Sequence, residues 1–191
     1  QIKINQALAE ELYASGNYDA MYFAGIIADP KAMRAADFNR WIEQAYFYMI
    51  SDYVVAVTLA EADIAQDVAD AWIASGEELK MSAGWSCYCW LLGNRKDYEF
   101  DNSKIVGMLE MVRATIHESP KRTKIAMNNF ITTVGVSFIP LHEMALEIAK
   151  EVGLVEIMKD EKKSTFLNAA EIIEKDVAKG RIGFKRKNVR C

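Results

Sequence analysis

The chain has 191 residues and a mass of 21.6 kDa, the size of one domain or one compact repeat array. Half of the residues are hydrophobic (51%) and a quarter are charged (26%), which excludes an intrinsically disordered protein. The low counts of glycine (10) and proline (3) exclude collagen-like and low-complexity sequences. Three cysteines, an odd number, argue against a disulfide scaffold and predict a reducing, cytoplasmic location.

Charge is unevenly distributed along the chain. Residues 1–120 contain 9 Lys and Arg against 18 Asp and Glu, a net charge of −9, whereas residues 121–191 contain 14 against 9, a net charge of +5. Phosphate binding depends on local charge, so the basic C-terminal third keeps a nucleic-acid partner open despite the overall pI of 5.3. We expect no transmembrane helix and no membrane partner, because no run of 18 apolar residues lacks a polar break.

Hydrophobic residues recur at helical spacing through most of the chain. The pattern i, i+3, i+4, i+7, i+11 is occupied by Ile105, Met108, Leu109, Val112 and Ile116. No convincing period-two alternation and no Asn-Gly or Asp-Gly turn occurs, so we expect no strands. Breaks at Gly, Pro, Ser and Asn predict about ten helices, over residues 3–15, 18–29, 36–45, 46–60, 63–75, 77–93, 102–118, 121–136, 141–152 and 166–179.

Three stretches contain almost no charge: residues 44–60, 81–94 and 125–141. Amphipathic helices lie between them, so charged outer helices alternate with uncharged inner ones. This alternation is typical of stacked helical pairs, in which neighbouring repeats cover each inner helix. We therefore predict an all-α fold, an α-α superhelix (solenoid) of helical pairs in a single domain over residues 1–191. The alternative is an irregular bundle with three buried helices.

Asp52 is the only charged residue in the stretch 44–60. Tyr48, Asp52, Val55 and Leu59 fall on one stripe of the predicted helix. A buried carboxylate without a partner is costly, so Asp52 must be paired inside the core or face a cleft. From the sequence alone, a structural role and a functional role of Asp52 are equally open.

The segment 85–90 places large aromatic and sulfur-containing side chains on one helix. Trp85 and Cys89 share a face, whereas Cys87 points elsewhere, so the two cysteines are poorly placed to chelate one metal ion. We expect mainly buried packing here, with the lining of a groove as the alternative. A zinc-protease motif begins at His142 but lacks its second histidine, and no phosphate-binding glycine loop occurs, so we expect no metal and no cofactor.

Two cationic clusters lie in the last third of the chain. Lys121, Arg122 and Lys124 open one predicted helix, and the tail 179–191 contains cations without any acidic residue. Such clusters are either solvated or bind a polyanion. The candidate DNA-contacting side chains are Lys121, Arg122, Lys124, Lys185, Arg186 and Lys187.

Several segments spread over nearly the whole chain carry a resemblance to a known family. They are Asn17-Tyr18-Asp19-Ala20-Met21-Tyr22-Phe23-Ala24, Asp29-Pro30, Trp41-Ile42, Ser51-Asp52, Trp72-Ile73-Ala74-Ser75 and the tail GRIGFKRKNVRC at 180–191. With these segments the chain resembles the AlkD-type DNA alkylation repair proteins, which are HEAT-like-repeat glycosylases. The resemblance implies a HEAT-like-repeat fold. It also implies that the family's first helices would precede Gln1.

The resemblance further implies excision of N3- or N7-alkylated purines from duplex DNA by hydrolysis of the N-glycosidic bond, by a monomer that needs no metal. The family's catalytic aspartate falls on Asp52, and the usual tryptophan one turn earlier is Tyr48. The sequence departs from the family near Ser82, where a DNA-contacting arginine is usual, and near Asn129, where a second catalytic tryptophan is usual. The alternative is a non-catalytic HEAT-like-repeat module that binds nucleic acid or protein.

Overall fold

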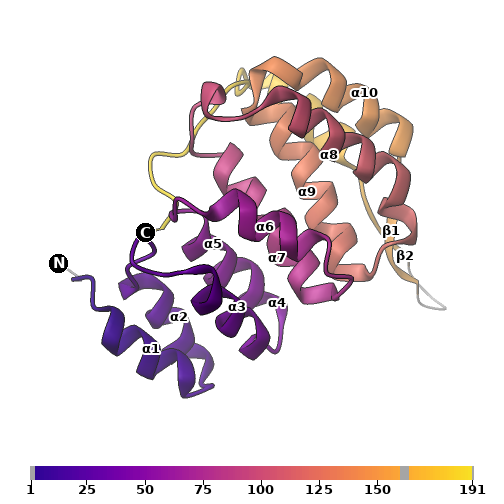
Figure 1. The fold of residues 1–191 in the computed structure, drawn as a ribbon. Helices are drawn as coiled ribbons and strands as arrows, with labels where there is room; N and C mark the ends of the chain where they lie inside the picture. The colour runs from indigo at the N-terminus through magenta and orange to yellow at the C-terminus, as the bar shows by residue number, and fades with distance from the viewer. Residues whose placement is uncertain (1–2, 160–163, 191) are drawn as a thin grey trace. The chain divides into compact units, whose positions relative to one another are not determined.

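The computed structural model describes residues 3–159 and 164–190. The chain forms two compact units, residues 1–90 with 188–191 and residues 91–187 (Figure 1). Apart from one two-stranded hairpin, the regular structure of the described residues is helical. The predicted all-α class is therefore confirmed.

The first unit consists of helices joined by short turns. Asn5 and Asn17 cap the first two helices, because their side-chain oxygens accept hydrogen bonds from the exposed backbone N–H groups of the first turn. The helices of this unit are α1 (Gln6–Ala14), α2 (Tyr18–Ile27), α3 (Ala35–Gln44), α4 (Tyr48–Ile50), a π-helical turn (Ser51–Val55), α5 (Ala56–Leu59), α6 (Ala65–Ile73) and α7 (Glu78–Leu92), whose last two residues belong to the second unit.

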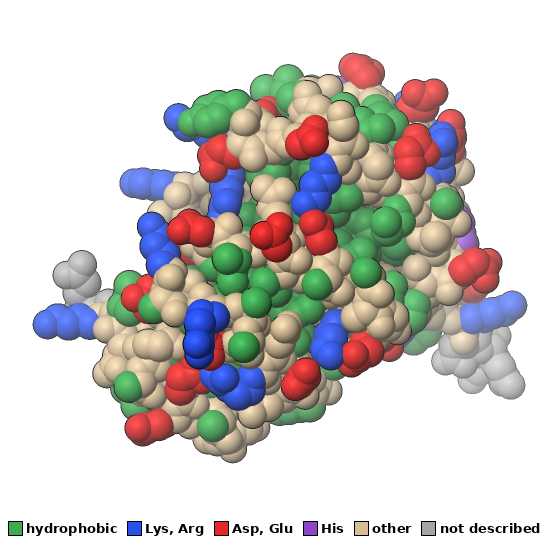
Figure 2. Space-filling view, in the orientation of Figure 1, with side chains coloured by type: hydrophobic (Ala, Val, Ile, Leu, Met, Phe, Trp, Pro, Cys, Tyr) green, Lys and Arg blue, Asp and Glu red, His purple; other side chains and the backbone are tan. Residues whose placement is uncertain are grey.

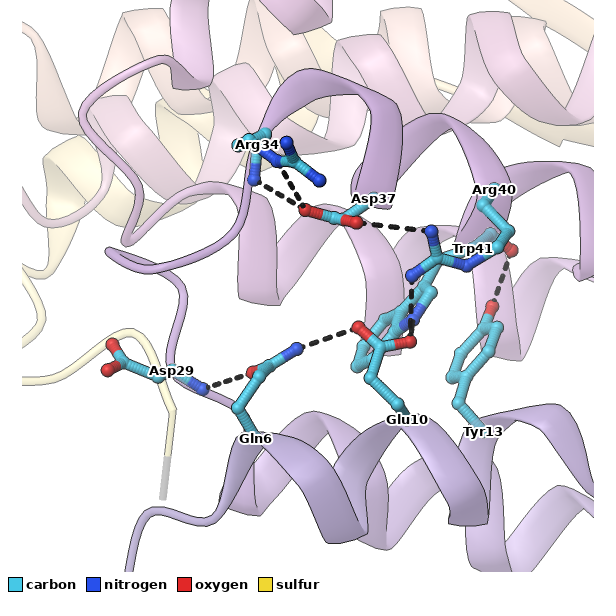
Figure 3. A network of polar contacts seen from close by, with 8 residues as sticks. All are labelled: Gln6, Glu10, Tyr13, Asp29, Arg34, Asp37, Arg40 and Trp41. Atoms are coloured by element: carbon cyan, nitrogen blue, oxygen red, sulfur yellow. Dashed lines mark hydrogen bonds and ion pairs between the residues drawn. The ribbon is translucent and has the colours of Figure 1, made fainter.

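A polar network joins α1 to α3 (Figure 3). The rings of Tyr13 and Trp41 stack with centroids 4.1 Å apart, and the Tyr13 hydroxyl donates a hydrogen bond to the Trp41 carbonyl at 2.7 Å. Glu10 accepts hydrogen bonds from the Trp41 indole at 3.0 Å and from Arg40 at 2.8 Å. Burial, and to a smaller extent the nearby Tyr46, raises the pKa of Tyr13, so this phenol remains a hydrogen-bond donor.

Asp37 closes the first turn of α3 in the same network (Figure 3). Its carboxylate accepts hydrogen bonds from the Arg34 backbone N–H at 2.9 Å and from the Arg40 guanidinium at 3.1 Å. The backbone hydrogen bond, and then Arg40, lower the pKa of Asp37 against the opposing effect of burial. This carboxylate therefore stabilises the start of α3 at neutral pH, and its contribution is lost as acid protonates it.

The segment predicted as one helix over 46–60 is helical from Tyr48 to Leu59 but contains the π turn Ser51–Val55. Ala56 N–H donates to the Ser51 carbonyl, five residues earlier, which is the spacing of a π helix. Helix α2 packs closely on this turn at Gly25, where an added Cβ atom would lie 2.7 Å from Val54 Cγ1. The location of the helix was predictable, and the turn within it was not.

The second unit is built around α8 (Asn102–Thr115), α9 (Lys121–Ser137) and α10 (His142–Val152), which pack side by side (Figure 1). Helix α11 (Ala169–Ala178) packs against α9. Short 3-10 helices occur at Asp97–Glu99, Ile116–Glu118 and Ile139–Leu141. No single described helix is long and apolar enough to span a membrane. Helix α9 and the following helical segment Ile139–Val152 reach the required length and apolar composition only when they are taken together, and they are bent by 107° relative to each other.

A β-hairpin follows α10, and the sequence did not predict it. Strands β1 (Val155–Lys159) and β2 (Ser164–Leu167) pair antiparallel, with Val155 opposite Leu167. Only Val155 is buried, and the pairing is irregular between Glu156 and Met158, so no alternation of hydrophobic and polar residues marks these strands. The predicted helix 166–179 accordingly begins later, at Ala169.

Two glycines of the second unit test how tightly its helices pack. At Gly135 on α9, an added Cβ would lie 2.5 Å from Ile173 Cδ1, whereas at Gly107 on α8 no atom lies within 4 Å. We expect Gly135→Ala to lower the free energy of unfolding by about 1–3 kcal/mol through overpacking. Gly107→Ala should raise it by about 0.4–1 kcal/mol, because alanine favours the helix. Urea denaturation checks both, and an unchanged or increased stability of Gly135→Ala would contradict the close packing.

Candidate nucleic-acid interface

The Asp52 carboxylate lies inside the first unit, on the π turn. The residue is 4% exposed. Its Oδ1 accepts a hydrogen bond from the Ser51 hydroxyl and its Oδ2 accepts one from the Ser82 hydroxyl, both at 2.7 Å. Of the two possibilities left open by the sequence, the structure therefore shows the paired one, and these hydroxyl groups compensate the loss of water around the carboxylate.

Helix α7 is tied to the π turn at a second point. The Trp90 indole Nε1 donates a hydrogen bond to the Asp52 backbone carbonyl at 3.3 Å. Ser82 and Trp90 lie eight residues apart on α7, which places them on one face of the helix. Asp52 thus accepts hydrogen bonds from α7 at two positions, through its side chain from Ser82 and through its backbone carbonyl from Trp90.

Exposed aromatic rings lie on the same segment of the chain as this buried carboxylate. Tyr48 and Tyr53 are 36% and 45% exposed. Their rings meet edge to face with centroids 6.5 Å apart, and Tyr53 meets Trp90 in the same way at 6.4 Å. The series continues through Phe47 to Tyr46, which is 57% exposed. The structure therefore places Tyr48 and Asp52 on one helical segment, with the ring facing solvent and the carboxylate in the core.

A cavity of about 230 Å³ opens beside these rings, within the first unit. Its walls come from α2, α4, the π turn, α5, the end of α7 and the C-terminal segment. The residues that line it are Tyr22, Gly25, Ile26, Met49, Tyr53, Val54, Val57, Thr58, Trp90, Val189 and Arg190.

Arg190 closes one side of the cavity. Its Nη2 and Nε donate to the Glu61 carboxylate at 2.6 and 3.0 Å, and its Nη1 donates to the carbonyls of Gly25 and Ala28 at 2.6 and 3.2 Å. The two carbonyls lie at the end of α2, where a cation offsets the partial negative charge of the helix terminus. This cation of the predicted basic tail therefore holds the tail on the first unit.

The other predicted cations lie in the second unit. Lys185 is half-buried, because its amino group donates to the Leu92 carbonyl and pairs with Asp97, both at 2.7 Å. Arg186 and Lys187 are exposed. Lys121 is exposed at the start of α9, whereas Arg122 and Lys124 are half-buried. The structure thus leaves Lys121, Arg186 and Lys187 as the most accessible of the six candidates.

The two units differ in charge. Residues 1–90 contain 5 Lys and Arg against 13 Asp and Glu, and residues 91–187 contain 17 against 14. Charges of both signs are interspersed with hydrophobic side chains on the face shown in Figure 2. The first unit is therefore acidic, and the second carries a small excess of positive charge.

The segment 85–90 contributes both to the buried core and to the lining of the cavity. Trp85, Cys87 and Tyr88 are fully buried, and Trp90 lines the cavity. The Tyr88 hydroxyl donates to Asp70 at 2.6 Å, and burial, followed by this contact, raises the pKa of Tyr88. Among residues 3–159 and 164–190, no group of three or more His, Cys, Asp or Glu side chains is placed to hold a metal ion.

Sequence reasoning missed three residues of this region: Ser82, Tyr22 and Arg190. In the sequence, Ser82 marks only a position near which the usual arginine is absent. In the structure, its hydroxyl donates a hydrogen bond to Asp52, which lies 30 residues earlier in the chain. A buried acid on an apolar helix signals that a donor is needed, but not which residue supplies it. Tyr22 was part of the family-like segment, and Arg190 was treated only as one of the tail cations.

The DNA alkylation repair enzyme family matches residues 1–169, and the chain therefore belongs to this family. A solved structure that is 74% identical covers all of this chain and 81% of its own, with a TM-score of 0.95. It is described as a new family of proteins related to the HEAT-like repeat DNA glycosylases with affinity for branched DNA structures. This likeness confirms the HEAT-like-repeat class of the fold.

Two bacterial relatives are more distant. Uncharacterized protein Lin0241 from Listeria innocua serovar 6a is 28% identical over 172 residues, which cover 90% of this chain and 74% of the relative. Uncharacterized protein Lmo0209 from Listeria monocytogenes serovar 1/2a is 29% identical over 154 residues, which cover 80% of this chain and 66% of the relative.

The serine contacts of Asp52 lead to a stability prediction. Ser82→Ala removes a hydrogen-bond donor from a buried carboxylate and should lower the free energy of unfolding by about 1.5–3 kcal/mol. Ser86→Ala, a half-buried position on the same helix, is the control and should change it by about 0.5 kcal/mol or less. Equal stabilities of the two variants in urea denaturation would contradict the role of Ser82.

Proposed function

We propose that this protein binds branched DNA, with aromatic rings of the first unit against exposed bases and cations of the second unit against phosphates. The observation that carries the proposal is the series of exposed rings around the π turn, Tyr46, Tyr48 and Tyr53. Membership of a DNA repair family and the DNA affinity described for the 74% identical relative support it.

The rings are suited to bases rather than to the phosphate backbone. Every base has a flat π face, so an aromatic side chain can stack on it without regard to sequence. In a continuous duplex these faces are covered by neighbouring base pairs. At a branch point the stack is interrupted, and the faces of the terminal pairs become accessible. An aromatic surface on an acidic unit therefore favours a branched substrate over an uninterrupted duplex.

The cations of the second unit supply the sequence-independent part of the affinity. Each Lys or Arg that neutralises a phosphate releases counterions, and the affinity falls as the salt concentration rises. Lys121, Arg186 and Lys187 are exposed, whereas Arg122, Lys124 and Lys185 are half-buried. The three exposed cations are the side chains to which we assign these contacts.

This proposal predicts that a four-way junction binds more tightly than a duplex of the same sequence. Tyr48→Ala should weaken junction binding by about tenfold, the effect of losing one stacked base. Tyr98→Ala is the matched control, since Tyr98 is 80% exposed but lies in the second unit. Fluorescence anisotropy with labelled DNA measures both, and equal affinities of the wild type for junction and duplex would refute the preference.

Excision of N3- or N7-alkylated purines is the second candidate function. It is favoured by the position of a carboxylate on the segment that carries Tyr48. An alkylated purine leaves from an oxocarbenium-like sugar, and a carboxylate can stabilise that cation. If the protein excises alkylated purines, Ser51 and Ser82 orient the Asp52 carboxylate. Asp52 is only 4% exposed, so DNA binding must then open a path to it.

Release of methylated purines from alkylated duplex DNA tests the second candidate. If Asp52 is catalytic, Asp52→Asn should reduce the excision rate by about 10²-fold, because it keeps the shape and removes the charge. Tyr48→Phe keeps the ring and should retain most of the rate. If the wild type releases no alkylated purine and Asp52→Asn only lowers the melting temperature, Asp52 is a structural residue and excision is excluded.

A further inference from the structure

The cavity of the first unit has three aromatic walls. Tyr22 comes from α2, Tyr53 from the π turn and Trp90 from α7, and Met49 adds a flexible apolar surface. Tyr53 also belongs to the exposed ring series and contacts the half-buried Trp90, so the cavity is continuous with the proposed DNA-binding surface. Flat apolar walls of this kind accommodate a planar ring system.

One polar atom inside the cavity is oriented by the fold. The Thr58 hydroxyl donates its proton to the Val54 carbonyl at 2.8 Å. Its Oγ1 also lies 3.5 Å from the Gly25 carbonyl, so the hydroxyl is satisfied within the protein. Thr58 is fully buried, and both it and Val54 line the cavity. An occupant of the cavity therefore meets mainly apolar surface.

The walls are held in place without a ligand. Arg190 joins the C-terminal segment to Glu61 and to the end of α2, and the Trp90 indole is fixed by the Asp52 carbonyl. Helix α2 lies so close to the π turn at Gly25 that even one added carbon would meet Val54. A preformed cavity binds without the entropic cost of ordering its walls.

We infer that this cavity binds one unpaired nucleobase at a DNA branch point. The inference rests on the proposed function, because it names the part of branched DNA that the first unit binds. A base offers flat faces to the three rings. A phosphate does not suit the site, because Arg190, the cation among the described residues that line it, is already paired with Glu61 and with two carbonyls.

The test compares two three-way junctions that differ only by one unpaired adenosine at the branch. The wild type should bind the junction with the unpaired base about tenfold more tightly, the scale of one base stacked on aromatic side chains. Equal binding of the two junctions overturns this inference and leaves the proposed function intact. Binding to neither junction contradicts the proposed function and the inference together.

Two variants locate the effect in the cavity. Tyr22→Ala removes one wall, and Ile26→Trp fills the space from a half-buried position on α2. Each variant should abolish the preference for the junction with the unpaired base. Each should change the affinity for the junction without an unpaired base by about twofold or less. Tyr98→Ala should keep the preference. Circular dichroism and thermal melting confirm folding, and a preference retained in both folded cavity variants overturns the inference.

Photo-crosslinking provides a readout that does not depend on any variant. A junction whose unpaired nucleotide carries 5-iodouracil is irradiated with the wild-type protein, and the adduct is mapped by mass spectrometry. The inference predicts adducts on Tyr22, Tyr53 or Trp90. Adducts confined to the second unit, for example on Tyr98, overturn it.

Discussion

A carboxylate in the core must receive hydrogen bonds, and Asp52 imposes this requirement on the first unit. Ser51 and Ser82 supply hydroxyl donors to its two oxygens, and Trp90 donates to its carbonyl. These contacts bind the π turn to α7 and thereby set the positions of Trp90 and of the neighbouring Tyr53, whose rings meet at 6.4 Å. Two rings that line the cavity, Trp90 and Tyr53, are thus positioned by this one buried group.

In the proposed function, the two units divide the chemistry of DNA binding between them. The first unit is acidic and presents aromatic rings and a cavity lined by apolar groups, which suit bases. The second unit carries an excess of Lys and Arg, which suits phosphates. A protein that binds only the duplex backbone needs no such rings, whereas a branched DNA offers both features at one place.

The sequence predicted most of the fold, because nearly uncharged helices such as 46–60 must be buried and amphipathic ones must cover them. It did not predict the π turn at Ser51–Val55, because this segment is apolar on almost every side, and a shift by one residue leaves no mark in such a pattern. The hairpin was missed because only Val155 of its strands is buried. For the site, the isolated charge identified Asp52, but its partner Ser82 depends on tertiary packing that spacing along the chain does not encode.

The salt dependence of junction binding tests most directly whether bases and phosphates are bound by different side chains. Plots of log K against log salt are compared for the wild type, for Tyr53→Ala and for the triple variant Lys121→Gln, Arg186→Gln, Lys187→Gln. The account predicts that Tyr53→Ala lowers the affinity at every salt concentration and leaves the slope unchanged, whereas the triple variant reduces the slope by about two to three. A slope unchanged in the triple variant, or a slope altered by Tyr53→Ala, would contradict the account.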